Sequence, residues 1–388
     1  MGKKLEKMFI LSGEHILQIK ALHNAKESVL SYSIPQNYGE QAPLILNVEG
    51  EHLSYHFEKD NTNNDIIKFK IPALCADQKI RVKIDYLVIT KRGKVNVKKV
   101  KMKIPYKSKI PKEAEKWLNP TKCIQSNNIF IKAYSRFLQG FSKDLMWYVK
   151  KVMFWNAYHG IFIPYYKKVL IRNKFLNTLF LPDKYWYVLE DAVSCLLFGA
   201  FCSGKANLEV AMFRSRKIPT RLLIALPLFY GKKFWIDGLH YLPELFVPGY
   251  GWIRTQSGKV YSEPRNNIIL KIVHPKDENL AGGGLSYYGG TVTWFWFENS
   301  NLCFDTPNEF KLYKIPKSKK IGATIARGWK KKRFKIPKDI SIELFDITKE
   351  VWDKSLNNHK KINPLQKKAI DLLLDSRFEE YIKYMKNI

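Results

Sequence analysis

A chain of 388 residues is too long for one ordinary hydrophobic core, so we expect two or three domains. Its hydrophobic content of 46% suffices for globular packing, and no long uncharged apolar run predicts a membrane-spanning helix. The net charge of +31 favours an acidic partner, such as nucleic acid, an anionic membrane surface or an acidic protein. The alternative is that a lysine-rich composition reflects genome bias and high solubility.

The cysteine pattern predicts reduced thiols in a cytoplasmic protein. The number of cysteines is odd, no Cys-x-x-Cys pair occurs, and the histidines are scattered, so we expect no metal site and no cofactor. The first 20 residues are charged throughout and lack the apolar region of a signal peptide. The five cysteines are Cys75, Cys123, Cys195, Cys202 and Cys303.

Residues 1–110 are predicted to form a β-sandwich domain. Apolar and polar residues alternate through several short segments, and Lys91 to Lys94 have the composition of a hairpin turn. The lysines that follow this turn are explained by a solvated strand face more simply than by a binding patch. The predicted strands cover residues 44–48, 52–57, 66–71, 80–89 and 95–104.

Residues 111–305 are predicted to form the core domain, after a linker marked by Pro105, Pro111 and Pro120. Helical apolar spacing occurs over residues 126–139, 143–158 and 184–198, and residues 221–229 and 268–274 are typical of buried strands. The many aromatic residues between 147 and 186 are expected to pack in the interior, although an aromatic-walled peptide cleft is an alternative.

Residues 306–388 are predicted to form a basic segment followed by a C-terminal helix. Residues 311–338 contain twelve Lys or Arg and no acidic residue, and include Lys330, Lys331, Lys332 and Arg333. This segment is the best candidate surface for nucleic acid or another anionic partner, and a solvated loop is the alternative. An amphipathic helix is expected from Asn363-Pro364 to Ile382.

Cys202 is the strongest candidate for a reactive group. Ser203 and Gly204 suit the start of a helix, strong helix formers follow, and Pro219 ends the pattern. A cysteine at a helix N-terminus meets the positive end of the helix dipole, which favours the nucleophilic thiolate. His240, after the next predicted strand, is the candidate base.

The same glycines also fit a phosphate-binding loop. Residues 199–205 match Gly-x-x-x-x-Gly-Lys, and the segment before them could be a strand. The position that should hold Ser or Thr for magnesium is Ala206, so we prefer the thiol interpretation.

The motifs around these residues resemble the transglutaminase-like superfamily. The resemblance implies an α+β fold with a papain-like, transglutaminase-like core, an N-terminal β-sandwich domain and a basic, helical C-terminal extension. The matching residues are Cys202, Asn207-Leu208, Arg214, Ile218-Pro219-Thr220-Arg221, His240, Glu244 and Pro248-Gly249-Tyr250-Gly251-Trp252.

The resemblance implies a Cys, His, Asp triad, in which Gln256 stands at the position of the Asp. A glutamine carbonyl can accept the ring N–H of His240 but supplies no charge, and Asp237 or Glu263 could serve instead. The implied reaction is acyl transfer on a peptide or protein amide, with hydrolysis favoured over cross-linking. A second hypothesis is a catalytically inactive binding module whose basic face meets an acidic partner.

Overall fold

The computed structural model describes seventeen stretches of the chain. Within them, no helix is both long enough and apolar enough to cross a membrane. The described residues are 8–20, 24, 26–39, 41–50, 53–91, 100–106, 110–156, 191–198, 202–227, 240–256, 259–261, 267–279, 286–288, 291–292, 332–335, 343–350 and 364–387.

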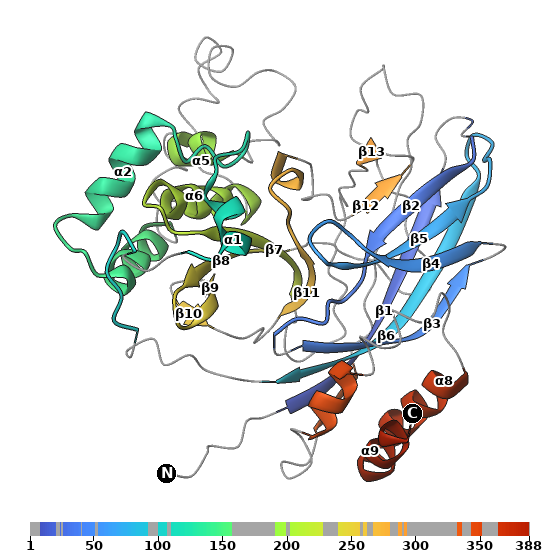
Figure 1. Cartoon of the computed structure of the whole chain (residues 1–388). Helices are drawn as coiled ribbons and strands as arrows, with labels where there is room; N and C mark the ends of the chain where they lie inside the picture. Colours follow the sequence, from blue (N-terminus) through green and yellow to red (C-terminus); the bar gives the residue numbers. More distant parts are fainter. Residues whose placement is uncertain are drawn as a thin grey trace.

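Two antiparallel sheets formed mainly by the first 91 residues face each other (Figure 1). Their facing strands share one hydrophobic core, in which Leu30, Phe69, Ile84 and Tyr86 are fully buried. The first sheet has the order β14 (Lys332–Lys335), β1 (Met8–Lys20), β6 (Lys79–Lys91) and β3 (Gln41–Gly50). The second has the order β13 (Thr291–Val292), β12 (Ser286–Tyr288), β2 (Ser28–Ser33), β5 (Asp65–Ile71) and β4 (Ser54–Lys59).

The strands predicted between residues 44 and 89 are present as β3 to β6. Burial does not follow the predicted alternation in β5, where Asp65, Ile66 and Ile67 are all buried. The strands β1 and β2 were not predicted. Residues 95–99 of the last predicted strand lie outside the described residues, and its described residues 100–104 make only an isolated bridge between Lys103 and Asp144. Sequence analysis assigns residues 286–288 and 291–292 to the core, but here β12 pairs with β2 of the sandwich and β13 pairs with β12.

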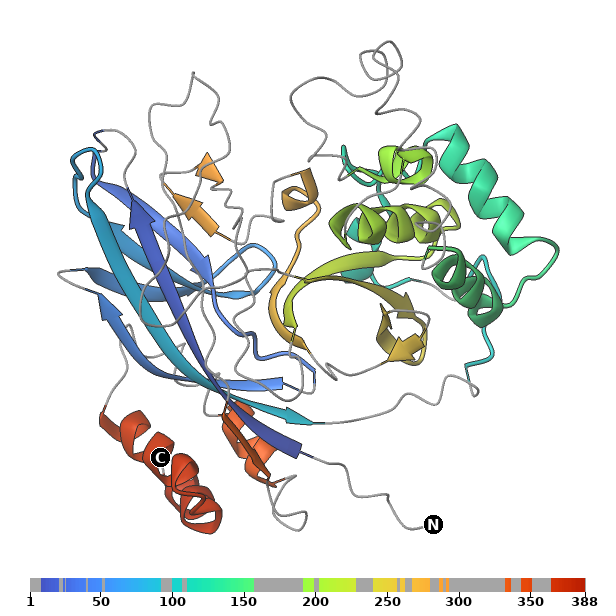
Figure 2. The ribbon, with the colours of Figure 1, turned by 180° about the vertical axis from the view of Figure 1, so that it is seen from behind.

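A third antiparallel sheet, with helices packed on one face, forms the core (Figures 1 and 2). Its order is β10 (Lys259–Tyr261), β9 (Gly251–Gln256), β8 (His240–Val247), β7 (Thr220–Pro227) and β11 (Asn267–Ile272). The helical side contains α1 (Lys112–Glu115), η2 (Lys116–Leu118), α2 (Ile129–Gln139), a helix over residues 145–156, α5 (Ala192–Phe198) and α6 (Cys202–Ser215), and η3 (Asp277–Asn279) follows β11.

Local sequence explains where the predicted core helices begin and end. The side chain of Asn128 caps α2 by accepting from the backbone N–H of Phe130, and Gly140 ends the helix with a φ of 57°. After the end of α6 at Ser215, Lys217 has a φ of 60°, and the N–H of Ile218 bonds the carbonyl of Phe213. This arrangement is a Schellman motif with lysine where glycine is usual.

The prediction of a single C-terminal helix is wrong. The chain forms two helices there, α8 (Pro364–Leu374) and α9 (Phe378–Lys386). Ser376, with a φ of 60°, occupies the left-handed position of a second Schellman motif, in which the N–H of Arg377 bonds the carbonyl of Leu372. The helix α8 lies against β3 (Figure 1). A further helix covers residues 343–350.

Side-chain amides join the sandwich to the free edge of β11. Gln41 donates to the carbonyl of Ile269 at 2.9 Å and accepts from its N–H at 2.9 Å, and Asn64 bonds both backbone groups of Ile272 in the same way. Gln36 donates to the carbonyl of Leu270 at 2.9 Å. These amides take the place of a neighbouring strand. They bond backbone groups on the free edge of β11 and fix the sandwich to the core.

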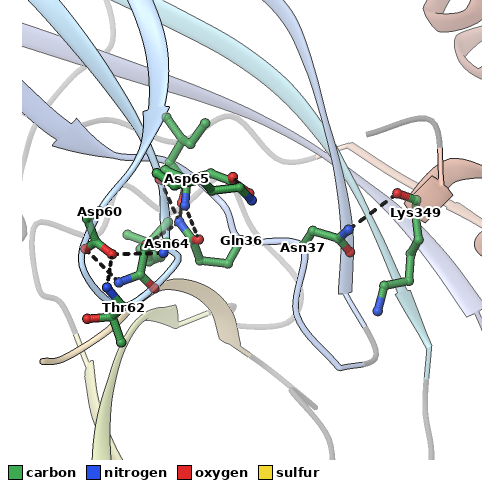
Figure 3. Close-up of polar contacts among 10 residues, drawn as sticks. Gln36, Asn37, Asp60, Thr62, Asn64, Asp65 and Lys349 are labelled. Atoms are coloured by element: carbon green, nitrogen blue, oxygen red, sulfur yellow. Dashed lines mark hydrogen bonds and ion pairs between the residues drawn. The ribbon is translucent and has the colours of Figure 1, made fainter. Parts of the chain in front are cut away.

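Polar contacts within the sandwich hold two of these amides in place (Figure 3). Asp60 accepts from the backbone N–H of Thr62 at 2.8 Å and of Asn64 at 2.9 Å. Gln36 accepts from the N–H of Asp65 at 2.6 Å. Nearby, Asn37 donates to the carbonyl of Lys349 at 3.4 Å, which ties this region to the C-terminal part of the chain.

Candidate functional site

The three residues predicted to be catalytic occupy positions at one end of the core sheet. Cys202 is the first residue of α6, His240 the first of β8, and Gln256 the last of β9. The chain reverses after α6 into β7, and each of β8 and β9 is antiparallel to its predecessor. The start of α6, the start of β8 and the end of β9 therefore lie at the same end. The side chains of Cys202 and Gln256, and the whole of Asp237 and Glu263, lie outside the described part of the chain.

One face of this sheet packs against α6. The hydroxyl of Thr255 on β9 donates to the carboxyl of Glu209 on α6. Leu222, Ile224 and Leu245 share this face, because side chains alternate along each strand, and they belong to the same core cluster as the buried residues of α6.

His240 alternates onto the other face. It pairs with Ala225 and lies two residues before Leu242, and both of these belong to a separate small cluster with Leu223 and Ile269. The observed register between β8 and β9 ends at the pair Glu244 and Arg254. Extending it by one more pair on the same face would set Gln256 opposite Leu242, with His240 as its diagonal neighbour. Cys202 begins α6, on the helical side of the sheet.

The imidazole of His240 is half-buried. Burial lowers its pKa below the usual value of 6.5, because desolvation disfavours the charged form. At neutral pH the ring is therefore neutral, which is the form a general base requires.

Glu209 is a buried carboxyl that the sequence analysis missed. It is 7% exposed, accepts hydrogen bonds from Thr255 and from the amide of Asn156 at 3.2 Å, and has no ion-pair partner among the described residues. Burial raises its pKa to about 7, although both hydrogen bonds act to lower it. A protonated Glu209 can itself donate to the Thr255 hydroxyl, which then donates to the carbonyl of Pro243, 3.4 Å away.

Three of the residues that match the motif, Arg221, Glu244 and Trp252, belong to one largely buried network with Tyr38 and Arg254. Arg221 donates to Glu244 at 2.8 Å and to the hydroxyl of Tyr38, which in turn donates to Glu244 at 2.5 Å. Arg254 lies 3.3 Å from the same carboxylate, and Arg221 lies 3.9 Å from the ring centroid of Trp252. Burial, together with the charge of Glu244, raises the pKa of Tyr38, so its hydroxyl remains a donor. These contacts link β7, β8 and β9 to Tyr38 of the sandwich.

Arg214, another residue of the motif, is also structural. Its guanidinium bonds Glu278 at 3.0 Å, the carbonyl of Asn119 at 2.8 Å and the carbonyl of Thr220 at 2.8 Å. Only 1% of Arg214 is exposed. Arg214 therefore connects the end of α6 to the linker, through Asn119, and to the segment after β11, through Glu278.

The helix that precedes Cys202 decides the phosphate-loop alternative and contains a second cysteine, Cys195. The segment before Cys202, which a phosphate-binding loop requires as a strand, forms the helix α5, so the phosphate-loop alternative is wrong. Cys195 on α5 is fully buried in the core, and burial raises the pKa of its thiol to about 12. Within the described residues, no group of three or more His, Cys, Asp or Glu could hold a metal ion.

Comparison with known proteins supports the fold. No protein-family model and no curated protein matches this chain. One solved structure, from Cytophaga hutchinsonii and described as a "Putative Cysteine Protease", aligns with a TM-score of 0.51 and 12% sequence identity. The alignment covers 83% of this chain and 98% of the other. At this identity the similarity establishes a shared mixed α and β fold.

Proposed function

We propose that this protein is a cysteine hydrolase of the transglutaminase-like superfamily that acts on a peptide or protein amide. The observation that carries the proposal is the placement of Cys202, His240 and Gln256 at one end of the core, with Cys202 at the N-terminus of α6. The similarity to the Cytophaga hutchinsonii protein supports the same reaction class.

In the proposed reaction, the Cys202 thiol transfers its proton to His240 and the thiolate attacks the amide carbonyl. The imidazolium then protonates the leaving amine, and a thioester forms as the C–N bond breaks. His240 then removes a proton from water, which attacks the thioester carbonyl. The C–S bond breaks, the carboxylic acid leaves, and the imidazolium of His240 returns the proton to the sulfur of Cys202. A second amine in place of water would make the reaction a cross-linking one.

Two features of the backbone favour this chemistry. A residue at the first position of a helix has an N–H without an intrahelical partner, so the Cys202 N–H can donate to the oxyanion of the intermediate. The helix dipole at the same position lowers the pKa of a thiol.

In this proposal Gln256 orients the ring of His240. Its carbonyl oxygen can accept the ring N–H and fix the tautomer, but it adds no charge to stabilise the imidazolium. We therefore expect the substitution Gln256→Asp to increase the rate.

A second candidate function is a catalytically inactive module that binds an acidic partner. It is favoured by the alternation along β8, which directs His240 away from the face that packs on α6. A Cys202–His240 contact would have to form around the end of the sheet.

Alkylation of the thiols distinguishes the two functions. The rate at which iodoacetamide modifies Cys202 would be measured against pH by mass spectrometry of its peptide, in the native chain and in His240→Ala. The exposed Cys75 in the same chain serves as the comparison thiol. For a catalytic pair, Cys202 titrates well below the ordinary thiol pKa of about 8.5, and the value rises in His240→Ala.

A Cys202 pKa near 8.5 that is unchanged by His240→Ala would support the binding module instead. Hydrolysis of a fluorogenic protein substrate provides the second readout. It should be lost in Cys202→Ala and increase in Gln256→Asp, and activity retained in Cys202→Ala would contradict the proposal.

A further inference from the structure

A cavity of about 630 Å³ lies between the sandwich and the segment that follows β11. One wall comes from β4 and β5 and includes His56 and Lys70, and the other includes Lys271, His274 and Lys276. Ligand sites in proteins commonly have volumes of about 300–1,000 Å³ and often lie where two units meet. This cavity therefore has the size and place of a binding site for a small molecule.

The two walls are held in a fixed relation. Asn64, which follows the turn on the sandwich side, bonds both backbone groups of Ile272 at the start of the opposite wall. Asp60 holds that turn through the backbone N–H groups of residues 62 and 64. On the core side, the buried Lys271 bonds Asp277 at 2.7 Å. The backbones of the two walls are thus already held together, and binding would have to order the exposed side chains of Lys70 and Lys276.

The charge of the lining is positive after internal pairing. Of its three carboxylates, Glu58 pairs with Lys68 and Asp277 pairs with Lys271, while Asp60 accepts backbone N–H bonds of the turn and keeps its negative charge. Among the described residues, neither Lys70 nor Lys276 lies within ion-pair distance of a carboxylate. These two ammonium groups, one on each wall, outweigh the charge of Asp60 and leave the lining positive.

His274, which lines the same cavity, supplies a neutral donor. Its Nδ1 accepts from the backbone N–H of Lys276 at 3.2 Å, so the proton of the neutral ring is on Nε2. Burial, aided by Lys116 and Lys276, lowers the pKa of His274 below its usual value, which keeps the ring neutral at pH 7. Asp277 and Asp60 oppose this effect.

We propose that this cavity binds a small organic polyanion, whose phosphate or carboxylate groups are held by Lys70 and Lys276 from opposite walls. His274 then hydrogen-bonds the ligand between them. Two ammonium groups on separate walls favour a ligand with two or more anionic groups over a single small anion. This site is separate from the end of the core that carries Cys202, and it does not depend on the proposed hydrolase activity.

Isothermal titration calorimetry on the full chain tests the site, with inorganic pyrophosphate and citrate as separate probes. The double variant Lys70→Gln/Lys276→Gln should bind the preferred probe at least about tenfold more weakly, because charge-assisted contacts are lost on both walls. Pyrophosphate preference would assign phosphate groups as the ligand chemistry, and citrate preference would assign carboxylates.

The control is Lys132→Gln/Lys150→Gln, which removes the same charge from exposed positions on α2 and on the helix over residues 145–156. It should change the affinity less than about twofold, since exposed charges far from the site are screened. Equal weakening in both double variants, or no binding to the native chain at millimolar probe, would overturn the proposal. Thermal unfolding without ligand verifies that both variants are folded.

Discussion

Replacement of the buried Glu209 by Gln should make the protein more stable above neutral pH. The folded-state pKa of about 7 lies above the ordinary value of 4.5, so the folded state holds this proton more tightly than the unfolded state. The free energy of unfolding therefore falls as the pH rises from 4.5 to about 7 and levels off above that. At about 1.4 kcal/mol per pH unit, this interval costs about 3 kcal/mol.

Glutamine removes that cost because it remains neutral and can still bond its neighbours. Its amide N–H can donate to Thr255, and its carbonyl can accept from Asn156, as a protonated Glu209 does. The Gln variant and the native chain should thus have similar stability at pH 4.5 to 5 and differ by about 3 kcal/mol at pH 8.

Urea unfolding followed by tryptophan fluorescence at pH 5, 6, 7 and 8 measures this difference. Glu27→Gln is the control, since Glu27 is exposed and the substitution removes the same charge. A stability difference between Glu209→Gln and the native chain that is equal at pH 5 and pH 8 would refute the reasoning.

Three further predictions concern other features of the chain. Glu244→Ala leaves the buried Arg221 without its carboxylate, so the free energy of unfolding in urea should fall by about 3–5 kcal/mol, and a loss below 1 kcal/mol would contradict the buried pair. Lys217→Gly should raise the free energy of unfolding by about 1 kcal/mol, because glycine adopts the left-handed conformation without strain. Lys217→Val should lower the free energy of unfolding. If the basic segment binds nucleic acid, neutralising residues 330–333 should weaken that binding and flatten its salt dependence, relative to four lysines neutralised elsewhere; unchanged binding would retire this surface.

Two residues of the basic run 330–333 have a structural explanation that requires no partner. Lys332 and Arg333 lie in β14, an edge strand that pairs with β1. Lysines on an edge strand discourage pairing with other chains, which explains part of the basic pattern without a partner.

The elements around the candidate site were largely predictable from the sequence. The start of α6 at Cys202, the strand β7 after Pro219 and the strand β11 were all expected from local patterns. Helix caps, proline and apolar periodicity act over a few residues, so they can be recognised without knowledge of the rest of the chain. The split of the C-terminal helix was missed because Ser376 adopts a conformation that usually requires glycine.

The environment of Glu209 could not be predicted in the same way. An isolated glutamate in a helix usually faces solvent, and the only local signal was its position between the apolar Leu208 and Val210. Its burial depends on Thr255 and Asn156, which lie about fifty residues away in opposite directions along the chain.

The sequence by itself determined the candidate chemistry: a thiol at a helix start, a histidine at a strand start, and a glutamine where the superfamily has an acid. Only the tertiary structure decided that these positions share one end of the core, that Gln41 and Asn64 fasten the sandwich to β11, and that a cavity lined by Lys70 and Lys276 lies beside that joint. The physical reason is range: helix caps and strand periods act between neighbours, whereas burial, pairing of distant charges and the edges of sheets depend on contacts far apart in the chain.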